Sequence, residues 1–319
     1  MGKIKLALLS GGVSSERQVS LNSGKQVFKA LDKDKYEISF YDPKIDLKQL
    51  VIDSDKIDVA LIILHGPFGE DGTIQGLLDL LNIPYQGAGV LGSSVAMNKL
   101  ISKHLYEKKA IPTPSYFSFS INEYIDLSLI IEKLGLPLVV KPTCAGSSQG
   151  MSLVKNELEF KEAISLGFKN DDTIIIEKYI KGVEITCGVL GNDKIFALPI
   201  IEIVPDKEYE YFDYEAKYKQ GATREICPAR IDKSIADQVQ KFAIQAHKAL
   251  FLKGYSRTDM IIDDGKIFVL ETNTIPGMTK TSLYPQSAEK AGYSFTALLD
   301  ELISLAIDEN KKQNLRRAK

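Results

Sequence analysis

Residues 257–283, RTDMIIDDGKIFVLETNTIPGMTKTSL, contain the clearest local pattern in the chain. Apolar runs at 260–262 and 267–270 flank the tripeptide Asp-Asp-Gly at 263–265. Two apolar runs joined by Asp-Gly are typical of a β-hairpin, because glycine accepts the positive φ angle of a tight hairpin turn. We therefore predict two antiparallel strands whose outer ends lie side by side.

Four polar residues occupy those outer ends. Asp259 opens the first strand, Glu271 and Asn273 close the second, and Arg257 lies just beyond them. Glu271 and Asn273 are two residues apart, so they point to the same face of an extended strand. Carboxylate and amide oxygens suit Mg²⁺, and an arginine suits a developing negative charge. The residues predict a metal–phosphate site; the alternative is a set of polar residues at the exposed ends of an edge hairpin.

The segment after the hairpin favours the first interpretation. Residues 274–279, TIPGMT, form a Pro-Gly loop directly beside the proposed metal ligands. Backbone N–H groups in such a loop can face an anion.

Composition limits the classes of protein to consider. A chain of 319 residues has room for two or three domains, and its formal net charge of −2 gives no reason to expect a nucleic acid or an anionic membrane as partner. No apolar stretch approaches the roughly 20 residues of a membrane span. The three cysteines are widely spaced and include no C-x-x-C pair, which predicts neither a disulfide framework nor a zinc site. We expect a soluble, cytoplasmic protein.

The N-terminal part has the pattern of a parallel α/β layer. Residues 4–9 and 58–64 are short apolar runs typical of buried strands, and a helical pattern follows the first of them. The loops after these strands contain Glu16 and His65. Ligands gather at the carboxyl ends of strands in open α/β sheets, where both of these loops fall. A single histidine after a strand more often has a structural role, so from this pattern alone a binding role for His65 is the alternative.

The central part contains a candidate phosphate loop. Residues 138–141 (LVVK) precede a loop at 142–150 that is rich in glycine and serine, and a further strand pattern follows. Small residues let backbone N–H groups approach phosphate oxygens, and Lys141 supplies a positive charge. The segment is not a Walker A motif, because no helix with Gly-Lys-Ser/Thr follows; a structural hairpin is the alternative.

Two further stretches suit a nucleotide. Glu177 lies in a strand pattern at 173–179, and Glu184 follows it; these carboxylates suit an adenine amino group and ribose hydroxyls. Residues 209–220, YEYFDYEAKYKQ, mix aromatic and charged side chains without a clear period. Such a stretch is either a disordered insertion or a lid, and its five aromatic residues favour a lid.

Two helices are predicted near these segments. Residues 84–100 indicate a turn and then a short helix carrying Lys99. Residues 234–250 have the spacing of an amphipathic helix, and Ser234 with Asp237 resembles a capping box at its start.

These motifs, taken together and in order, resemble those of the ATP-grasp ligases, and most closely the D-alanine–D-alanine ligases. The resemblance runs from Gly11 to about Gly292 and includes the strings SGGVSSERQVS, LHGPFGEDG, AGSSQG and EAKY. It implies a multi-domain α/β ATP-grasp fold. The implied domains are an N-terminal parallel-sheet domain at 1–97, a central α+β domain at 98–182 and a C-terminal α+β domain at 183–319.

The resemblance also implies roles at the amino-acid site. Glu16 resembles the glutamate that holds the amino group of the first D-alanine, and Ser147 and Tyr218 resemble its hydrogen-bonding partners. His65 resembles the histidine beside this substrate. Tyr218 in the lid favours D-alanine over D-lactate as the second substrate.

Four residues resemble those that act on the second substrate and on the reacting group. Ser282 and Leu283 match the pair that receives the carboxylate of the second D-alanine. Arg257 and the backbone N–H of Gly277 match the oxyanion hole.

The remaining implied roles concern ATP and its metal ions. The family uses two Mg²⁺ ions, for which Mn²⁺ substitutes. The implied metal ligands are Asp259, Glu271 and Asn273. The implied ATP contacts are Lys99, Lys141 and Lys217 at the phosphates, Glu177, Lys178 and Ile180 at the adenine, Glu184 at the ribose, and Leu270.

The implied function is the ATP-dependent joining of two D-alanines through an acyl phosphate, for peptidoglycan precursors. Family likeness also implies a homodimer that binds neither nucleic acid nor membrane. Two alternatives stay open: another ATP-grasp carboxylate–amine ligase, such as one forming D-alanyl-D-serine, and a non-catalytic nucleotide-binding module. A binding module has no need for the metal ligands together with Arg257, which favours an enzyme.

Overall fold

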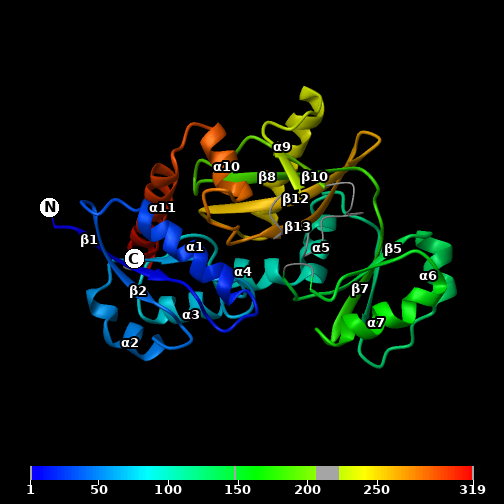
Figure 1. Cartoon of the computed structure of the whole chain (residues 1–319), viewed down its shortest axis with the longest axis horizontal. Coiled ribbons are helices and arrows are strands. Elements are labelled where there is room, and N and C mark those ends of the chain that lie inside the picture. The colour runs from blue at the N-terminus through cyan, green and yellow to red at the C-terminus, as the bar shows by residue number, and fades with distance from the viewer. Residues whose placement is uncertain (1, 147–148, 206–222, 318–319) are drawn as a thin grey trace.

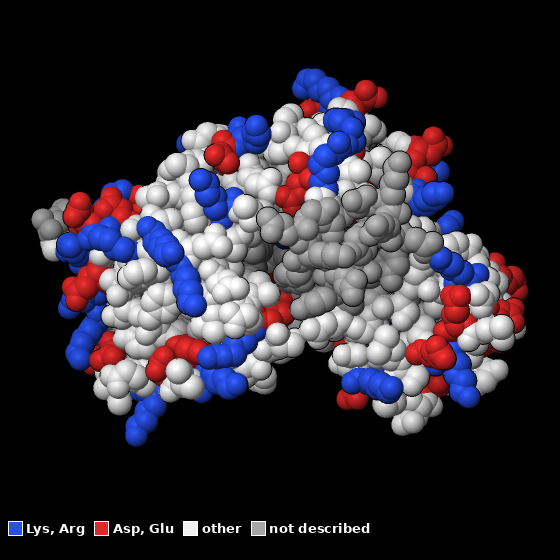
Figure 2. All heavy atoms as spheres, viewed as in Figure 1, with Lys and Arg blue, Asp and Glu red and all other residues white. Residues whose placement is uncertain are grey.

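The computed structural model describes residues 2–146, 149–205 and 223–317. Its strands form three separate sheets with helices packed around them (Figure 1). This arrangement agrees with the predicted multi-domain α/β class. On the face shown in Figure 2, basic and acidic side chains are intermixed.

The first sheet is parallel and has the strand order β2-β1-β3. All four residues of β3 are buried, as are the last four of β1, because helices cover both faces of the sheet. The elements of this part are β1 (Ile4–Leu9), α1 (Arg17–Ala30), β2 (Tyr36–Tyr41), α2 (Leu47–Ile52), η1 (Ser54–Lys56), β3 (Val59–Ile62), α3 (Thr73–Leu80) and α4 (Val90–Met97).

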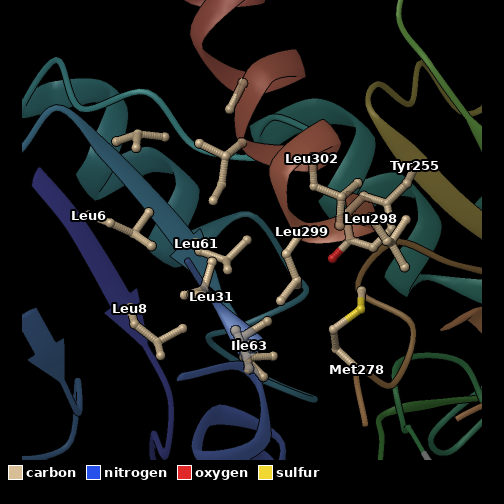
Figure 3. Close-up of a cluster of buried hydrophobic side chains, with 14 of the residues drawn as sticks. Leu6, Leu8, Leu31, Leu61, Ile63, Tyr255, Met278, Leu298, Leu299 and Leu302 are labelled. Carbon is tan, nitrogen blue, oxygen red and sulfur yellow. The ribbon is translucent and has the colours of Figure 1, made fainter. Parts of the chain in front are cut away.

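The last helix of the chain, α11 (Phe295–Arg317), packs against this first sheet. Leu6 and Leu8 of β1 share a buried cluster with Leu298, Leu299 and Leu302 of α11 (Figure 3). The cluster therefore joins segments from opposite ends of the sequence into one core.

The second sheet is antiparallel, with the order β4-β7-β5-β6. Helices α6 and α7 contribute buried side chains to its core, and these elements lie at the right of Figure 1. The elements of this part are α5 (Lys99–Lys108), β4 (Tyr116–Ser120), α6 (Leu127–Leu134), β5 (Leu138–Pro142), β6 (Ser152–Val154), η2 (Glu157–Glu159), α7 (Phe160–Phe168) and β7 (Thr173–Lys178).

The third sheet is also antiparallel, with the order β11-β10-β8-β12-β13 and with β9 paired to β8. It contains the predicted hairpin as β12 and β13, of which β13 is the edge strand. The elements of this part are β8 (Val183–Leu190), β9 (Phe196–Ala197), β10 (Ile201–Pro205), β11 (Thr223–Ile226), α9 (Lys233–Ala249), β12 (Tyr255–Asp263), β13 (Lys266–Asn273) and α10 (Leu283–Lys290).

Two predicted helices differ in detail from the structure. Lys99 does not end a short helix but begins α5, because the helix before it stops at Met97 and Asn98 has an extended backbone. The side chain of Asn98 accepts a hydrogen bond from the N–H of Ile101 (3.0 Å) and so caps the new helix.

The predicted capping box at Ser234 is wrong. The residue before the first turn of α9 is Asp232, so Ser234 lies inside the helix, and no side chain caps the helix start. Ser-x-x-Asp also departs from the Glu or Gln that the motif requires at its fourth position.

Among the described helices, none combines the length and apolar character needed to cross a membrane.

The shared core of the first sheet and α11 predicts a specific loss of stability. Leu302 is fully buried, so Leu302→Ala should lower the free energy of unfolding by about 2–5 kcal/mol, through lost burial and the cavity left behind. Urea unfolding followed by circular dichroism measures this change. Leu315→Ala is the matched control on the same helix, because Leu315 is 68% exposed. Equal effects of the two substitutions would contradict the packing described here.

Candidate active site

The hairpin brings the four predicted residues together. In its register Arg257 lies opposite Asn273 and Asp259 lies opposite Glu271, with a bulge directly after Asp259. At the other end, Asp264 and Gly265 both have positive φ angles (46° and 74°), the turn geometry for which Asp-Gly is preferred. The prediction of the hairpin is therefore confirmed.

Asp259 is the centre of a tight polar cluster. Arg257 donates to both of its oxygens, from Nε to Oδ1 and from Nη2 to Oδ2, each at 2.8 Å. Thr186 Oγ1 donates to Oδ1 (2.6 Å), and Asn273 Nδ2 donates to Oδ2 (3.0 Å). Burial alone would lower the pKa of the Arg257 guanidinium, but the charge and hydrogen bonds of the adjacent Asp259 outweigh it and raise the pKa. The fork of Arg257 is therefore fixed in position and permanently charged.

The donor set at this end fits a hard metal ion. Among the described residues, no group of three His, Cys, Asp or Glu side chains is placed to hold a metal ion. The predicted set is of another kind, because it contains two carboxylates and one amide. The amide of Asn273 uses its nitrogen toward Asp259, which leaves its oxygen as a donor. Glu271 lies across the strand pair with its Oε2 3.4 Å from Lys99 Nζ. Two carboxylates and an amide oxygen suit Mg²⁺ when nucleotide phosphates and waters complete the shell.

A first cleft, enclosing about 940 Å³ that is partly open to solvent, lies between the second and third sheets. Its walls include every described residue that was predicted to contact ATP. These residues are Lys99, Lys141, Glu177, Lys178, Ile180, Glu184 and Leu270. Lys217 lies outside the described residues.

Glu177 is held by two lysines. Its Oε1 is 2.5 Å from Lys141 Nζ, and its Oε2 is 2.8 Å from Nζ of Lys103, a residue that the sequence interpretation missed. Burial opposes ionisation of Glu177, but the charges of both lysines lower the pKa of its carboxyl below the ordinary value. The carboxylate predicted to contact adenine thus also anchors the lysine predicted to contact phosphate.

A second cleft, of about 1430 Å³, adjoins the first. Its lining includes the described residues predicted to contact amino acids or the reacting group, namely Glu16, His65, Arg257, Gly277, Ser282 and Leu283. Lys99, Ala145 and Glu271 line both clefts. The two clefts therefore meet between Lys99 and the hairpin end.

Glu16 enters the second cleft because of the loop after β1. Gly11 has a φ angle of 98°, and a side chain there would lie 2.6 Å from the carboxylate of Asp42. Asp42 accepts a hydrogen bond from the N–H of Gly12 (2.8 Å) and pairs with Arg17 (2.5 Å) at the start of α1. Glu16 immediately precedes this helix and is only 7% exposed.

His65 and Glu70 lie near Glu16, in the loop after β3. Burial lowers the pKa of His65; the charge of Glu16 opposes this effect and that of Arg257 adds to it. Among the described residues, His65 Nε2 is a buried ring nitrogen with no hydrogen-bond partner. Burial and the charge of Glu16 raise the pKa of Glu70 to about 8, although its Oε2 accepts a hydrogen bond from the N–H of Gly66 (2.7 Å).

The loop after the hairpin closes the far side of the second cleft. Ser282 precedes α10, and its Oγ accepts a hydrogen bond from the N–H of Thr279 (3.1 Å). A Cβ at Gly277 would lie 3.1 Å from the same Oγ, so the absence of a side chain there allows the close approach. Gly277 and Ser282 therefore lie side by side in this wall of the cleft.

The predicted site residues and the described cleft residues overlap only in part. Ser147, Tyr218 and the proposed lid at 209–220 lie outside the described residues. The sequence interpretation assigned no role to Glu70 or Glu225, which line the second cleft, or to Lys103. Glu70 lies in the Gly-rich loop after His65, and this position could have indicated a site residue. No sequence pattern around Glu225 or Lys103 indicates one.

The raised pKa of Glu70 predicts a pH-dependent stability. The folded chain retains a proton on Glu70 that the unfolded chain loses above the ordinary value of 4.5, so ionisation costs stability as the pH rises toward about 8. Glu70→Gln removes this cost. The melting temperature of the variant should match that of the wild type at pH 5 and exceed it by about 3 °C or more at pH 8.5. A difference that stays the same at both pH values would contradict the raised pKa.

Two family models match the chain, one described as the D-Ala–D-Ala ligase N-terminus at residues 44–88 and one as the D-Ala–D-Ala ligase C-terminus at residues 105–304. The D-alanine–D-alanine ligase of Syntrophobacter fumaroxidans is 58% identical, over 96% of this chain and 99% of its own length. That of Desulfotalea psychrophila is 51% identical, over 97% of both chains.

Solved structures give the same result. The D-alanine–D-alanine ligase of Bacillus anthracis in complex with ATP has a TM-score of 0.86 at 37% identity, covering 97% of this chain and 99% of that one. The VanG D-Ala:D-Ser ligase of Enterococcus faecalis has a TM-score of 0.82 at 33% identity, covering 96% and 100%. The chain therefore belongs to the D-alanine–D-alanine ligase family and is an enzyme with the ATP-grasp fold.

Proposed function

We propose that this enzyme joins two D-alanines to D-alanyl-D-alanine and converts ATP to ADP and phosphate. The observation that carries the proposal is the meeting of the two clefts at Lys99, Ala145 and Glu271. One cleft is lined by lysines and apolar side chains that suit a nucleotide, and the other by carboxylates and Arg257 that suit amino acids. A phosphoryl group at the junction lies within reach of both sites.

The amino-acid cleft provides opposite charges for the ends of its substrates. Glu16 holds the ammonium group of the first D-alanine, with His65 beside it. Ser282 and the backbone at Leu283 receive the carboxylate of the second D-alanine, at the start of α10, where helix N–H groups favour an anion. With its ammonium group held by Glu16, the first D-alanine directs its free carboxylate toward the nucleotide.

The reaction then follows from the positions of the charged groups. The carboxylate of the first D-alanine attacks the γ-phosphoryl group of ATP, giving an acyl phosphate and ADP, while Lys99 and Lys141 neutralise phosphate charge. The amine of the second D-alanine attacks the acyl carbon, phosphate departs, and the amine loses a proton. Arg257, fixed by Asp259, and the N–H of Gly277 stabilise the tetrahedral oxyanion.

We also propose that Asp259, Glu271 and Asn273 bind two Mg²⁺ ions, for which Mn²⁺ substitutes. The metal ions neutralise the charge of the ATP phosphates and help to align them. The chain itself provides the carboxylates, and Arg257 and Lys99 balance their charge.

Family likeness supports several further proposals. We propose domains at 1–97, 98–182 and 183–319, each containing one of the three sheets, with α11 of the last domain packed against the sheet of the first. The product serves peptidoglycan precursor synthesis in the cytoplasm, and the active form is a homodimer, which sedimentation equilibrium at micromolar concentration tests. Nucleic acid and membrane are not partners.

The proposed reaction is tested by phosphate release from purified protein with Mg-ATP and one amino acid or hydroxy acid at a time. D-alanine should support release, with D-alanyl-D-alanine formed in a one-to-one ratio; L-alanine should not. Addition of D-serine or D-lactate to D-alanine, followed by mass spectrometry of the products, tests the second subsite. Preferential formation of D-alanyl-D-serine would replace the proposed product, and no release under any condition would exclude the ligase reaction.

Glu271→Gln should lower turnover by at least about a hundredfold, because the site loses one of two carboxylates that balance its cations and bind metal. Binding of Mn²⁺ in the presence of ADP, followed by electron paramagnetic resonance, should weaken as well. Glu289→Gln makes the same chemical change at an exposed position and should leave both measurements unaltered. Normal Mn²⁺ binding by Glu271→Gln would remove Glu271 from the metal site.

A further inference from the structure

Lys103 is a fully buried lysine one helical turn after Lys99 on α5. Its Nζ donates to Thr113 Oγ1 (2.6 Å) and to the carbonyl of Pro114 (3.4 Å), and pairs with Glu177 Oε2 (2.8 Å). It also lies 5.0 Å from the centre of the Tyr116 ring. A buried ammonium group is costly unless such partners surround it, so the site is built to hold a charge.

Lys103 and Lys141 approach Glu177 from different sides. Lys141 lines the nucleotide cleft, whereas Lys103 is absent from the described walls of both clefts. The single carboxylate uses Oε1 for Lys141 (2.5 Å) and Oε2 for Lys103. Lys103 is therefore connected to the cleft through two residues of its wall, Glu177 by charge and Pro114 by a long hydrogen bond to its carbonyl.

The trio of Lys103, Lys141 and Glu177 contains more positive charges than negative ones. Two ammonium groups share one carboxylate, so the fully ionised trio has a net charge of +1. Burial lowers the pKa of Lys103 to about 8, the charge of Glu177 opposes this shift and that of Lys141 adds to it. Lys103 therefore stays largely protonated at neutral pH. Without Lys103, Glu177 would pair with Lys141 alone, and the two charges would cancel.

We propose that Lys103 is a positioning residue that holds Glu177 from behind the cleft wall and compensates its charge, so that the trio as a whole presents one net positive charge to a phosphate of the bound nucleotide. Lys103 itself does not contact the nucleotide. The inference rests on the proposed function only in taking the first cleft as the nucleotide site. It differs from a purely structural role, in which Lys103 would support the wall and affect every ligand of the cleft equally.

The test compares ADP with adenosine, because both fill the adenine and ribose positions but only ADP has phosphates. Isothermal titration calorimetry gives a Kd for each, and the ratio of the adenosine Kd to the ADP Kd measures phosphate recognition alone. Lys103→Met should lower this ratio about tenfold, a loss equivalent to one partly screened charge interaction. Lys108→Met, which removes a charge from an exposed position of the same helix, should leave the ratio unchanged.

Two further variants separate charge from packing. Lys103→Arg retains the charge and should keep the ratio within about twofold of the wild type. The double variant Lys103→Met with Glu177→Gln again gives the trio a net charge of +1, and its ratio should recover about tenfold over Lys103→Met alone. Thermal melts establish that each variant is folded. If Lys103→Met is not folded, the arginine and double variants are compared with the wild type, whose ratio both should match within about twofold.

Equal losses of ADP and adenosine affinity in Lys103→Met, or a double variant no better than Lys103→Met, would overturn the proposal. Failure of the proposed function is distinguishable, because ADP binding needs no D-alanine. A wild-type protein that binds ADP but forms no dipeptide would exclude the ligase reaction and leave the role of Lys103 open to the same measurement.

Discussion

The register of the β12–β13 hairpin is the constraint on which the rest of the site depends. A slip of one residue between these strands would turn Asp259 and Glu271 to opposite faces. The Asp264-Gly265 turn fixes the pairing at one end, and at the other end the bulge after Asp259 aims the polar residues. The hydrogen bond from Asn273 Nδ2 on β13 to Asp259 Oδ2 on β12 depends on this register.

Charge pairing then extends from the hairpin into both clefts. Lys99 stands where the clefts meet and faces Glu271. Glu177 lies deeper, between two ammonium groups. Removing one partner from such a buried set costs more than the pair contributes, since the remaining charge loses its compensation. The site is consequently held together by the same electrostatics that the proposed reaction uses.

Local patterns predicted much of this structure. The hairpin, the parallel strands of the first sheet and the lysine-bearing strand β5 were evident because periodicity and turn residues act over a few positions. Lys103 was missed because its partner Glu177 is 74 positions away, and an isolated lysine in a helix normally faces solvent. The break at Asn98 was missed because it depends on tertiary contacts, among them the hydrogen bond from the N–H of Lys99 to the carbonyl of Thr143. The roles predicted for the site residues stay predictions, and Ser147, Lys217 and Tyr218 also lie outside the described residues.

The packing of α11 on the first sheet has a consequence for folding during synthesis. β1 is translated before α11, yet Leu6 and Leu8 complete their core with Leu298 and Leu302. Domains that are contiguous in sequence can fold as soon as they leave the ribosome, whereas this core is complete only after α11 has been made. Until then the apolar side chains that α11 covers stay exposed to solvent. The middle sheet, whose strands β4 to β7 are contiguous, has no such delay.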